Sequence, residues 1–304
     1  MASGHRTELV YRLLGLTGLV SLARRRRAHG VVFCYHNVVA DTEGLPNDNG
    51  LHMHRAHFER QMEWIASHFA VIPLCELVDR IAAKRPMRGL AALTFDDAYQ
   101  GFFHHAVGTL RALRLPATVF VVSDAAASPA GFWWDHPAMR DDGDGSRRDH
   151  WLRALQGDAR RILAEVAASP TWRPPADLLP ADWTAIRAAC GGNLDVGAHS
   201  ASHRALSTLS DDDLNNELVE SRERVRAATG RPVDLFSYPY GWWDARVQRA
   251  VRHAGYAGAV TLDAGFNGDG CDPWRVRRIN VPAGIGDAPF QAWASGLALR
   301  AALS

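Results

Sequence analysis

The chain has 304 residues, of which 47% are hydrophobic and 22% charged, and its formal net charge is +1. These values are typical of a globular protein, and they exclude wholesale disorder, a collagen-like repeat and a coiled coil. The balanced charge gives no reason to expect a nucleic-acid partner. Lys84 is the only lysine, in an Ala-Ala-Lys-Arg-Pro context. A phosphate-binding P-loop and a Schiff-base enzyme each need a lysine in another setting, so both classes are excluded.

The N-terminal segment, residues 1–30, combines a short apolar run with a cluster of arginines. Leu13–Val20 is apolar and Arg24–Arg27 follow it. The run is far shorter than the roughly 18 residues that indicate a spanning helix, and four arginines after Ser-Leu-Ala oppose export. We expect a basic, amphipathic arm that either lies on an anionic membrane surface or docks on the domain. We therefore expect a cytoplasmic protein, with peripheral membrane contact left open.

After residue 30, short β-rich runs alternate with helical patterns, which indicates βαβ units and a parallel sheet. Phe58, Met62 and Ile65 recur at helical spacing and predict a helix that buries one face. The predicted strands are Val31–Tyr35, Leu90–Phe95, Ala117–Val122, Leu194–Val196, Leu235–Tyr238 and Gly258–Thr261, and the predicted helices are Ala56–His68, Gln100–Leu113, Asp211–Thr229 and Asp244–Ala254.

One stretch, about residues 136–180, departs from this alternation. It holds a polar, glycine-broken loop at 141–145, an arginine-rich helical pattern and a proline-rich segment. We interpret it as a helical insertion on an α/β barrel. The expected organisation is an arm at 1–30, one catalytic domain at 31–290 and a C-terminal helix or tail at 291–304.

Two adjacent carboxylates, Asp96 and Asp97, end the predicted strand Leu90–Phe95. In α/β barrels the carboxyl ends of the strands carry the chemistry. Neighbouring aspartates there can take different roles, one as a metal ligand and one as a base. An isolated Asp-Asp pair is more often a cap or a turn, so the pair needs support from elsewhere in the chain.

That support comes from His199 and His203, which follow the predicted strand Leu194–Val196. Histidines four residues apart project from one face of a helical turn and can hold one divalent ion. The spacing alone is a weak signal. With Asp97 it gives two imidazoles and one carboxylate, a set that suits zinc, with cobalt or manganese as alternatives.

A third segment, Tyr238-Pro239-Tyr240-Gly241, also lies just past a predicted strand. We expect it to place backbone N–H groups and aromatic rings at the mouth of a site. An ordinary turn with aromatic packing is the alternative.

Together these segments resemble the polysaccharide deacetylases, carbohydrate esterases that carry the NodB homology domain. The resemblance covers about residues 31–285 and implies a distorted (β/α) barrel. The matching motifs, in the family's order, are Thr94-Phe95-Asp96-Asp97, His199-Ser200-x-x-His203 and Tyr238-Pro239-Tyr240-Gly241, with flanking matches at Leu115–Phe120 and His253–Tyr256.

The resemblance also implies roles for individual residues. Asp97, His199 and His203 would hold the metal, and Asp96 would be the base that activates a metal-bound water. The water would attack the carbonyl of an N-acetyl group, and the metal with a backbone N–H near Tyr240 would stabilise the oxyanion.

Two departures from the family pattern lead to further assignments. The family usually has arginine at the position of Ser237, and Arg278 is a candidate to tether the base in its place. No histidine follows His253, so the family's late acid is missing. His36 ends the first predicted strand, as in exopolysaccharide deacetylases with an N-terminal Tyr-His segment, and we assign it as the acid; a core hydrogen-bonding role is the alternative.

Other conspicuous residues receive lesser assignments. Trp134 and Asp135, beside the insertion, and Tyr238 and Pro239 are the candidate substrate contacts, although aromatic pairs usually pack in the core. Five further histidines have no partner spacing and are expected on the surface or at helix caps, without a second metal site: His52, His54, His57, His104 and His105.

The function expected from these features is metal-dependent removal of an acetyl group from an N-acetylated sugar, in a polysaccharide or a lipid-linked saccharide. A first alternative is deformylation or amide hydrolysis of a small or lipid-linked compound. A second is a carbohydrate-binding pseudoenzyme, which ranks lower because the base and both ligand histidines are present.

Overall fold

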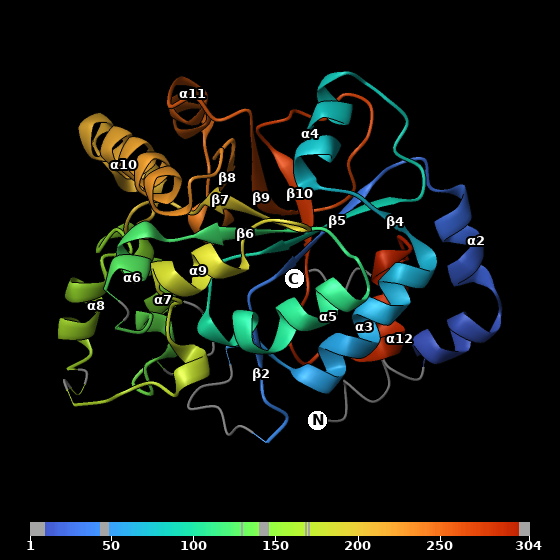
Figure 1. Ribbon diagram of the computed structural model, residues 1–304, viewed down its shortest axis with the longest axis horizontal. Coiled ribbons are helices and arrows are strands. Elements are labelled where there is room, and N and C mark those ends of the chain that lie inside the picture. The colour runs from blue at the N-terminus through green and yellow to red at the C-terminus, as the bar shows by residue number, and fades with distance from the viewer. Residues whose placement is uncertain are drawn as a thin grey trace.

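The computed structural model describes residues 10–42, 49–128, 130–139, 146–167, 169 and 171–297. At its centre lie seven parallel strands: β1 (Val31–Tyr35), β5 (Leu90–Phe95), β6 (Ala117–Val121), β7 (Leu194–Ala198), β8 (Leu235–Ser237), β9 (Gly258–Ala264) and β10 (Val276–Asn280). They pair in the order β1-β10-β9-β8-β7-β6-β5, and β5 pairs back to β1, which closes a barrel (Figure 1). A short strand, β4 (Ala70–Val71), pairs with the start of β5 outside this ring. The predicted distorted (β/α) barrel is confirmed.

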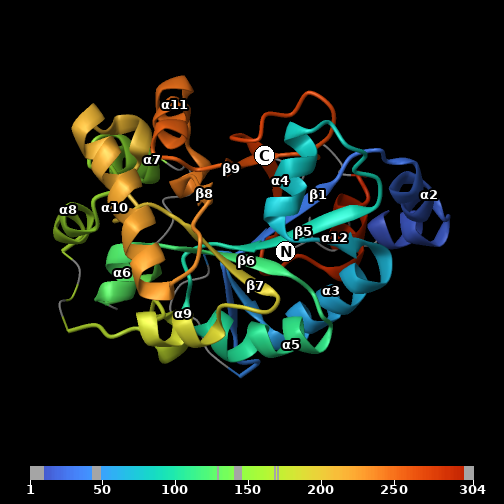
Figure 2. The same ribbon diagram turned by 45° about the horizontal axis from the view of Figure 1, so that its top comes forward.

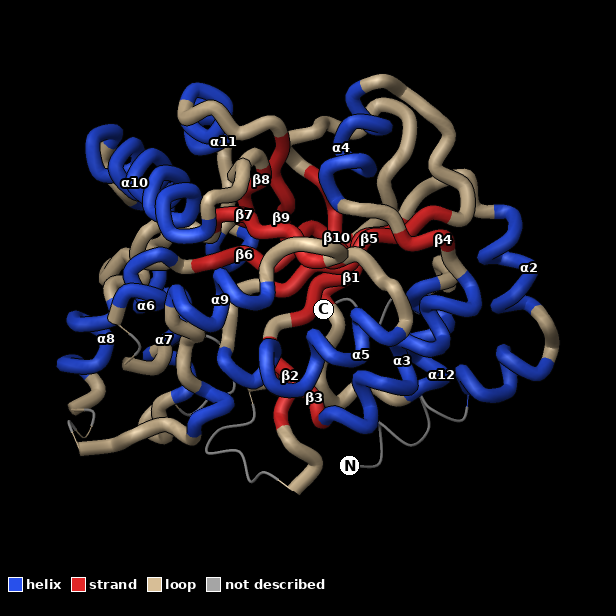
Figure 3. The backbone as a smooth tube through the Cα atoms, viewed as in Figure 1, coloured by secondary structure: helices blue, strands red, loops and turns tan. Residues whose placement is uncertain are grey.

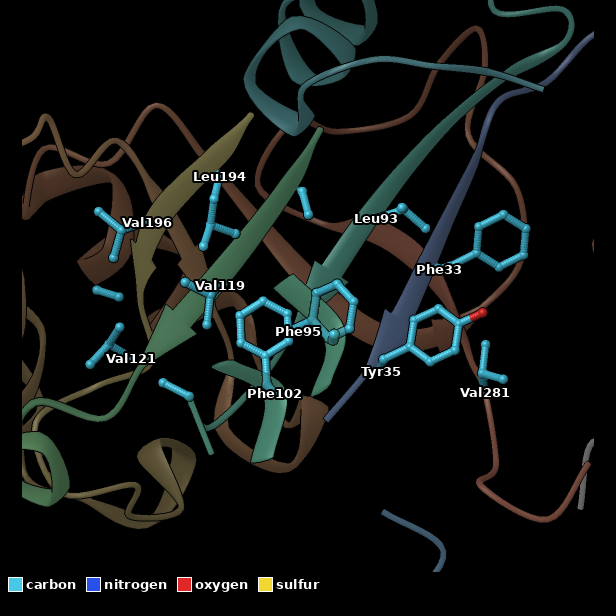
Figure 4. Packing of buried hydrophobic residues seen from close by; sticks show 14 of the residues in the cluster. Phe33, Tyr35, Leu93, Phe95, Phe102, Val119, Val121, Leu194, Val196 and Val281 are labelled. Atoms are coloured by element: carbon cyan, nitrogen blue, oxygen red, sulfur yellow. The ribbon is translucent and has the colours of Figure 1, made fainter. Parts of the chain in front are cut away.

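The barrel core has two parts because successive strand side chains point to opposite faces. Outward side chains such as Phe33, Tyr35 and Leu93 pack into one cluster with the surrounding helices (Figure 4). Inward side chains from six strands meet in a second cluster: Val32, Ala92, Phe120, Leu235, Val260 and Val276. The helix α4 (Leu74–Ala82) adds its apolar face to this second cluster and so covers the amino-terminal end of the barrel.

Helices surround the barrel in the described part of the chain (Figure 2, Figure 3). They are α3 (Arg55–His68), α5 (Val107–Ala112), α6 (Ser123–Ala127), α9 (Trp183–Ala189), α10 (Asp211–Thr229) and α11 (Ala245–His253). In α3 the predicted face of Phe58, Met62 and Ile65 is fully buried. The predicted helix Gln100–Leu113 differs from the structure, since a π-helical turn at Phe102–Ala106 precedes α5.

The predicted insertion contributes α7 (Ser146–Arg153), α8 (Ala159–Glu165) and a 3-10 turn at Ala176–Leu178, and another 3-10 turn at Trp133–Asp135 precedes it. Its predicted loop at 141–145 lies outside the described residues. Two short parallel strands, β2 (Asn37–Val39) and β3 (His52–His54), form a separate sheet after β1. Further 3-10 turns lie at Leu206–Thr208 and Pro239–Gly241.

The N-terminal segment is docked on the domain by one of its faces. Residues 10–16 are helical, and α2 (Leu19–Arg26) follows them. Tyr11 and Val20 are buried against Ala292 of α12 (Asp287–Ala294). The boundary predicted between residues 290 and 291 falls inside this helix. Among the residues described, no helix is long and apolar enough to cross a membrane.

Candidate active site

Asp96 and Arg278 form a buried ion pair inside the barrel. Arg278 lies on β10 and is fully buried, and Asp96 directly follows β5. Nη1 and Nη2 of Arg278 donate to the two carboxylate oxygens of Asp96 at 2.8 and 2.7 Å. The other guanidinium donors go to Thr94 Oγ1, Ser237 Oγ and Thr261 O. All five guanidinium N–H groups are thus used, and Arg278 does contact the carboxylate that it was expected to tether.

The neighbouring carboxyls Asp96 and Asp97 are shifted in opposite directions. Burial by itself raises the pKa of Asp96, but the Arg278 guanidinium, assisted by His199, outweighs burial and holds that pKa well below its usual range. Burial also raises the pKa of Asp97, and the charges of Asp96 and Asp135 raise it further. Asp97 therefore needs a cation beside it to be ionised near neutral pH.

Asp97, His199 and His203 converge on one point. Nε2 of His199 and Nε2 of His203 each lie 3.5 Å from Oδ1 of Asp97, and the two Nε2 atoms are 3.1 Å apart. Nδ1 of His199 bonds the carbonyl oxygen of Ser237 at 2.8 Å, which leaves Nε2 as the ligand nitrogen. The expected helical turn between the histidines is wrong: Ser200 and His203 adopt left-handed backbone angles in a loop after β7.

These three side chains fit a divalent cation. Oδ1 of Asp97 and Nδ1 of His203 are buried without a hydrogen-bond partner. Burial lowers the pKa of both histidines, which favours the neutral form that binds metal. Two imidazole nitrogens and a carboxylate oxygen that face one another at these distances repel unless a shared proton or a cation lies between them. The donor set is the one expected for zinc with open coordination positions.

His36 lies beside Asp96. One of its nitrogens, Sγ of Cys34 and an oxygen of Asp96 all lie within 4.8 Å of one another. Burial lowers the pKa of His36 to about 4, although the charge of Asp96 opposes the shift. His36 is therefore neutral at rest near pH 7.

The turn after β8 brings Tyr240, but neither Tyr238 nor Pro239, to the site. Tyr240 adopts φ +58°, and its ring packs against the ring of His203 at 4.5 Å. Tyr238 is buried and its hydroxyl donates to Trp274 O, while Pro239 is buried beneath the turn. The two hydrogen bonds within the turn are donated by Gly241 and Trp242, so Tyr240 N–H takes no part in them.

Trp134 forms part of the site wall, whereas Asp135 lies behind it. The Trp134 ring packs on His203 at 4.7 Å, and its indole N–H donates to Tyr99 Oη at 2.7 Å. Tyr99 in turn donates to Asp135 Oδ2 at 2.8 Å. Asp135 is 1% exposed and is not among the residues that line the cavity, so its contacts are with the protein.

Sequence reasoning missed His52, which was expected on the surface. It is 3% exposed, and Nε2 contacts Asp135 Oδ1 at 2.9 Å while Nδ1 accepts from Asn37 at 3.0 Å. His52, Asp135 and Tyr99 therefore form a buried hydrogen-bonded chain that ends at Trp134. The spacing of these residues in the sequence gave no signal for the chain.

A second histidine cluster also differs from the expectation. His104 and His105 both contact the carboxylate of Asp177, at 2.9 and 2.6 Å. Both side chains reach the same carboxylate, although adjacent residues on an α-helix are separated by about 100°. They therefore share a partner after all, at a place outside the cavity.

The site opens into a cavity of about 210 Å³. Its wall includes His36, Asp96, Asp97, His199, His203, Trp133, Trp134, Arg148, Tyr240 and Asn280. A larger surface hollow of about 550 Å³ is lined by residues such as Asp124, Ser202 and Glu217, and it contains neither the ion pair nor the ligand triad. The smaller cavity is therefore the candidate active site.

Comparisons with known proteins identify the family. A sequence profile described as polysaccharide deacetylase matches residues 83–259, more than half of the chain. The chain is 18% identical over 264 residues to "Putative polysaccharide deacetylase YxkH" of Bacillus subtilis, over 86% of this chain and 75% of that protein.

Two solved structures share the fold. IcaB from Ammonifex degensii matches with a TM-score of 0.61 and 19% identity, over 88% of this chain and 98% of that one. A de-N-acetylase from Aggregatibacter actinomycetemcomitans matches with a TM-score of 0.62 and 14% identity, over 87% of this chain and 99% of that one. The profile match, joined to this fold, places the chain in the polysaccharide deacetylase family, hydrolases that act on carbon–nitrogen bonds.

Proposed function

We propose that this protein is a metal-dependent deacetylase that hydrolyses the N-acetyl group of an amino sugar in a polysaccharide or a lipid-linked saccharide. One observation carries the proposal. A single cavity at the carboxyl ends of the strands contains a convergent metal-ligand triad and, beside it, a carboxylate kept ionised by a buried guanidinium. Hydrolysis of an unactivated amide needs both an electrophile and a base at the same carbonyl.

Asp97, His199 and His203 would hold the cation, for which zinc is the first choice and cobalt or manganese are alternatives. When bound there, a divalent cation would supply positive charge that polarises the acetyl carbonyl and acidifies a water molecule. The hydrogen bond from His199 Nδ1 to Ser237 O fixes the orientation of one ligand ring.

Asp96 is the proposed base. It takes a proton from the water whose oxygen bonds to the acetyl carbon. Arg278 holds both carboxylate oxygens and so fixes the orientation of Asp96. Because the guanidinium keeps the pKa of Asp96 low, the carboxylate is ionised before each turnover.

His36 is the proposed acid for the leaving amine. Since His36 is neutral at rest, the proton that it delivers must arrive during turnover. Asp96 lies within reach of the imidazole, so the proton taken from water can pass to His36 and then to the amine nitrogen as the C–N bond breaks. The products are acetate and the free amine.

Tyr240 and Trp134 complete the proposed site. The backbone N–H of Tyr240 is our candidate donor to the oxyanion that forms on the acetyl oxygen. Tyr240 is left-handed, and so is Gly241, the next residue of the turn. A Cβ at position 241 would come within 2.5 Å of Leu262 Cβ, so the turn needs glycine there. Trp134 offers an aromatic face for a sugar ring.

The test is acetate release from N-acetylglucosamine oligomers by chelator-treated protein, before and after addition of zinc, cobalt or manganese. We expect release only with added metal. Asp96→Asn is the matched control, because it removes the base and keeps Asp97, His199 and His203. It should bind metal as well as the wild type and release almost no acetate. Metal-independent release, or full activity of the Asp96→Asn variant, would refute the mechanism.

The cavity volume favours one second candidate. About 210 Å³ is below the usual range for a drug-sized ligand, which suits a formyl or acetyl amide on a small compound. Metal-dependent hydrolysis of small formamides without release of acetate from the oligomers would select this alternative.

A further inference from the structure

The N-terminal helical pair, residues 10–16 with α2, carries an unusual concentration of exposed apolar side chains. Among the described residues, six large hydrophobic side chains are exposed. Five of them lie in this pair: Val10, Leu13, Leu16, Leu19 and Leu22. Leu16 is 85% exposed. Exposed hydrophobic residues are ordinary when scattered, whereas a contiguous group marks an interaction surface.

On α2, the exposed leucines share one face with two arginines. At about 100° per residue, Leu19, Leu22, Arg25 and Arg26 fall within an arc of about 120° on α2. Val20 points the other way and is buried against α12. α2 therefore has an inner face that docks it on the domain and an outer face on which two leucines are followed by two arginines.

The charged side chains of the segment are all positive. Residues 10–30 contain five arginines and no Asp or Glu. Arg24 and Arg27 turn inward, over the rings of Trp64 and Phe266 at 5.8 and 4.3 Å. Arg25 and Arg26 are exposed beside the leucines. An apolar face bordered by arginines matches an interface between anionic headgroups and acyl chains.

We propose that this outer face binds the surface of an anionic phospholipid bilayer, with the leucines at the acyl boundary and Arg25 and Arg26 at the headgroups. Both views place α2 beside α12 at one edge of the molecule, away from α8 and α10 (Figure 1, Figure 2). The segment leads into the amino end of β1, whereas His36 follows its carboxyl end. The binding surface and the cavity therefore lie toward different ends of the barrel, and this proposal does not depend on the chemistry of the cavity.

The experiment is co-sedimentation of the full chain with neutral phosphatidylcholine vesicles and with vesicles that contain one-third phosphatidylglycerol. We expect binding to the anionic vesicles, with a fall as salt is raised from 0.05 to 0.5 M. The triple variant Leu16→Ser/Leu19→Ser/Leu22→Ser should weaken binding at least about a hundredfold. The pair Arg25→Gln/Arg26→Gln should weaken it by about thirtyfold.

The matched controls are Val219→Ser, which changes the sixth exposed hydrophobic residue, and Arg153→Gln/Arg249→Gln, a pair of exposed arginines elsewhere. All variants change exposed side chains, so their unfolding midpoints serve as a check on folding. Wild-type binding by the leucine variant would overturn the proposal, as would equal binding to both vesicle types. Leucine-dependent dimers in lipid-free solution, without vesicle binding, would assign the face to a second copy instead.

Discussion

Replacing Arg278 with glutamine tests the central ion pair. The change removes both charge-assisted bonds to Asp96 and leaves a buried carboxylate without its compensating charge. Removal of one partner from a buried pair costs about 3–5 kcal/mol of stability. We expect a loss in this range at pH 8, because all five guanidinium donors are used and glutamine, with only two amide hydrogens, can replace few of them.

The loss should depend on pH in a defined direction. In the wild type the folded-state pKa of Asp96 lies below the unfolded value of about 3.9. Its contribution to stability is therefore full above that value and is lost only as pH falls through the folded pKa. In Arg278→Gln, burial loses its main opponent and only His199 and His36 still oppose it, so we expect the folded pKa of Asp96 to rise. The variant should thus lose most stability at pH 8, and the gap to the wild type should narrow toward pH 5 as Asp96 takes up a proton.

Urea unfolding of chelator-treated proteins at pH 8 and pH 5 measures both quantities. Arg277→Gln is the matched control, since Arg277 is adjacent and exposed. The double variant Asp96→Asn/Arg278→Gln should recover most of the loss, because no charge is then buried. A loss below about 1 kcal/mol, or an equal loss at both pH values, would refute the reasoning.

Three further changes test individual positions. His203→Ala should weaken zinc binding at least about a hundredfold, measured by competition with a chromophoric chelator; unchanged affinity would remove it from the triad. His36→Ala should lower kcat by about 10²–10⁴ with metal affinity intact, and a fully active variant would contradict its role as the acid. Gly101→Ala should cost about 1–3 kcal/mol in urea unfolding, because its Cβ would lie 2.4 Å from Val38 O and 2.5 Å from Asn37 Oδ1; an unchanged midpoint would contradict that contact.

Much of the fold could be predicted because its signals are local. The predicted strand Leu90–Phe95 matches β5, since a six-residue apolar run bounded by Gly89 and Asp96 is too short for a typical helix. The strand predicted to end at Val196 continues to Ala198. Gly197 has a low strand propensity, but a Cβ there would lie 2.5 Å from the Phe120 ring, so packing between β6 and β7 selects glycine. Because that contact joins two strands far apart in the sequence, the local hydrophobic pattern does not predict it.

The candidate site shows the same division. Asp96, Asp97 and His199 each follow a strand, and parallel strands bring their carboxyl ends together, so their proximity followed from the pattern. The bond from His52 to Asp135 joins residues 83 positions apart. No sequence motif links these two residues, and the sequence around His52 does not show whether the histidine is buried or exposed. The left-handed conformation of His203 was missed because His203 N–H donates to Ser200 Oγ, a local turn that replaces the expected helical turn.

The two adjacent aspartates show how one strand end produces two different carboxylates. Asp96 extends β5 into the barrel, where Arg278 supplies a permanent positive charge. At Asp97 the backbone turns left-handed, with φ +69°, and the next carboxylate faces His199 and His203 instead. Burial and the charge of Asp96 raise its pKa, so Asp97 becomes ionised readily only with an exchangeable cation beside it. As the pH falls, Asp97 therefore takes up a proton before Asp96 does, and the proposed base stays ionised after the neighbouring carboxyl has become neutral.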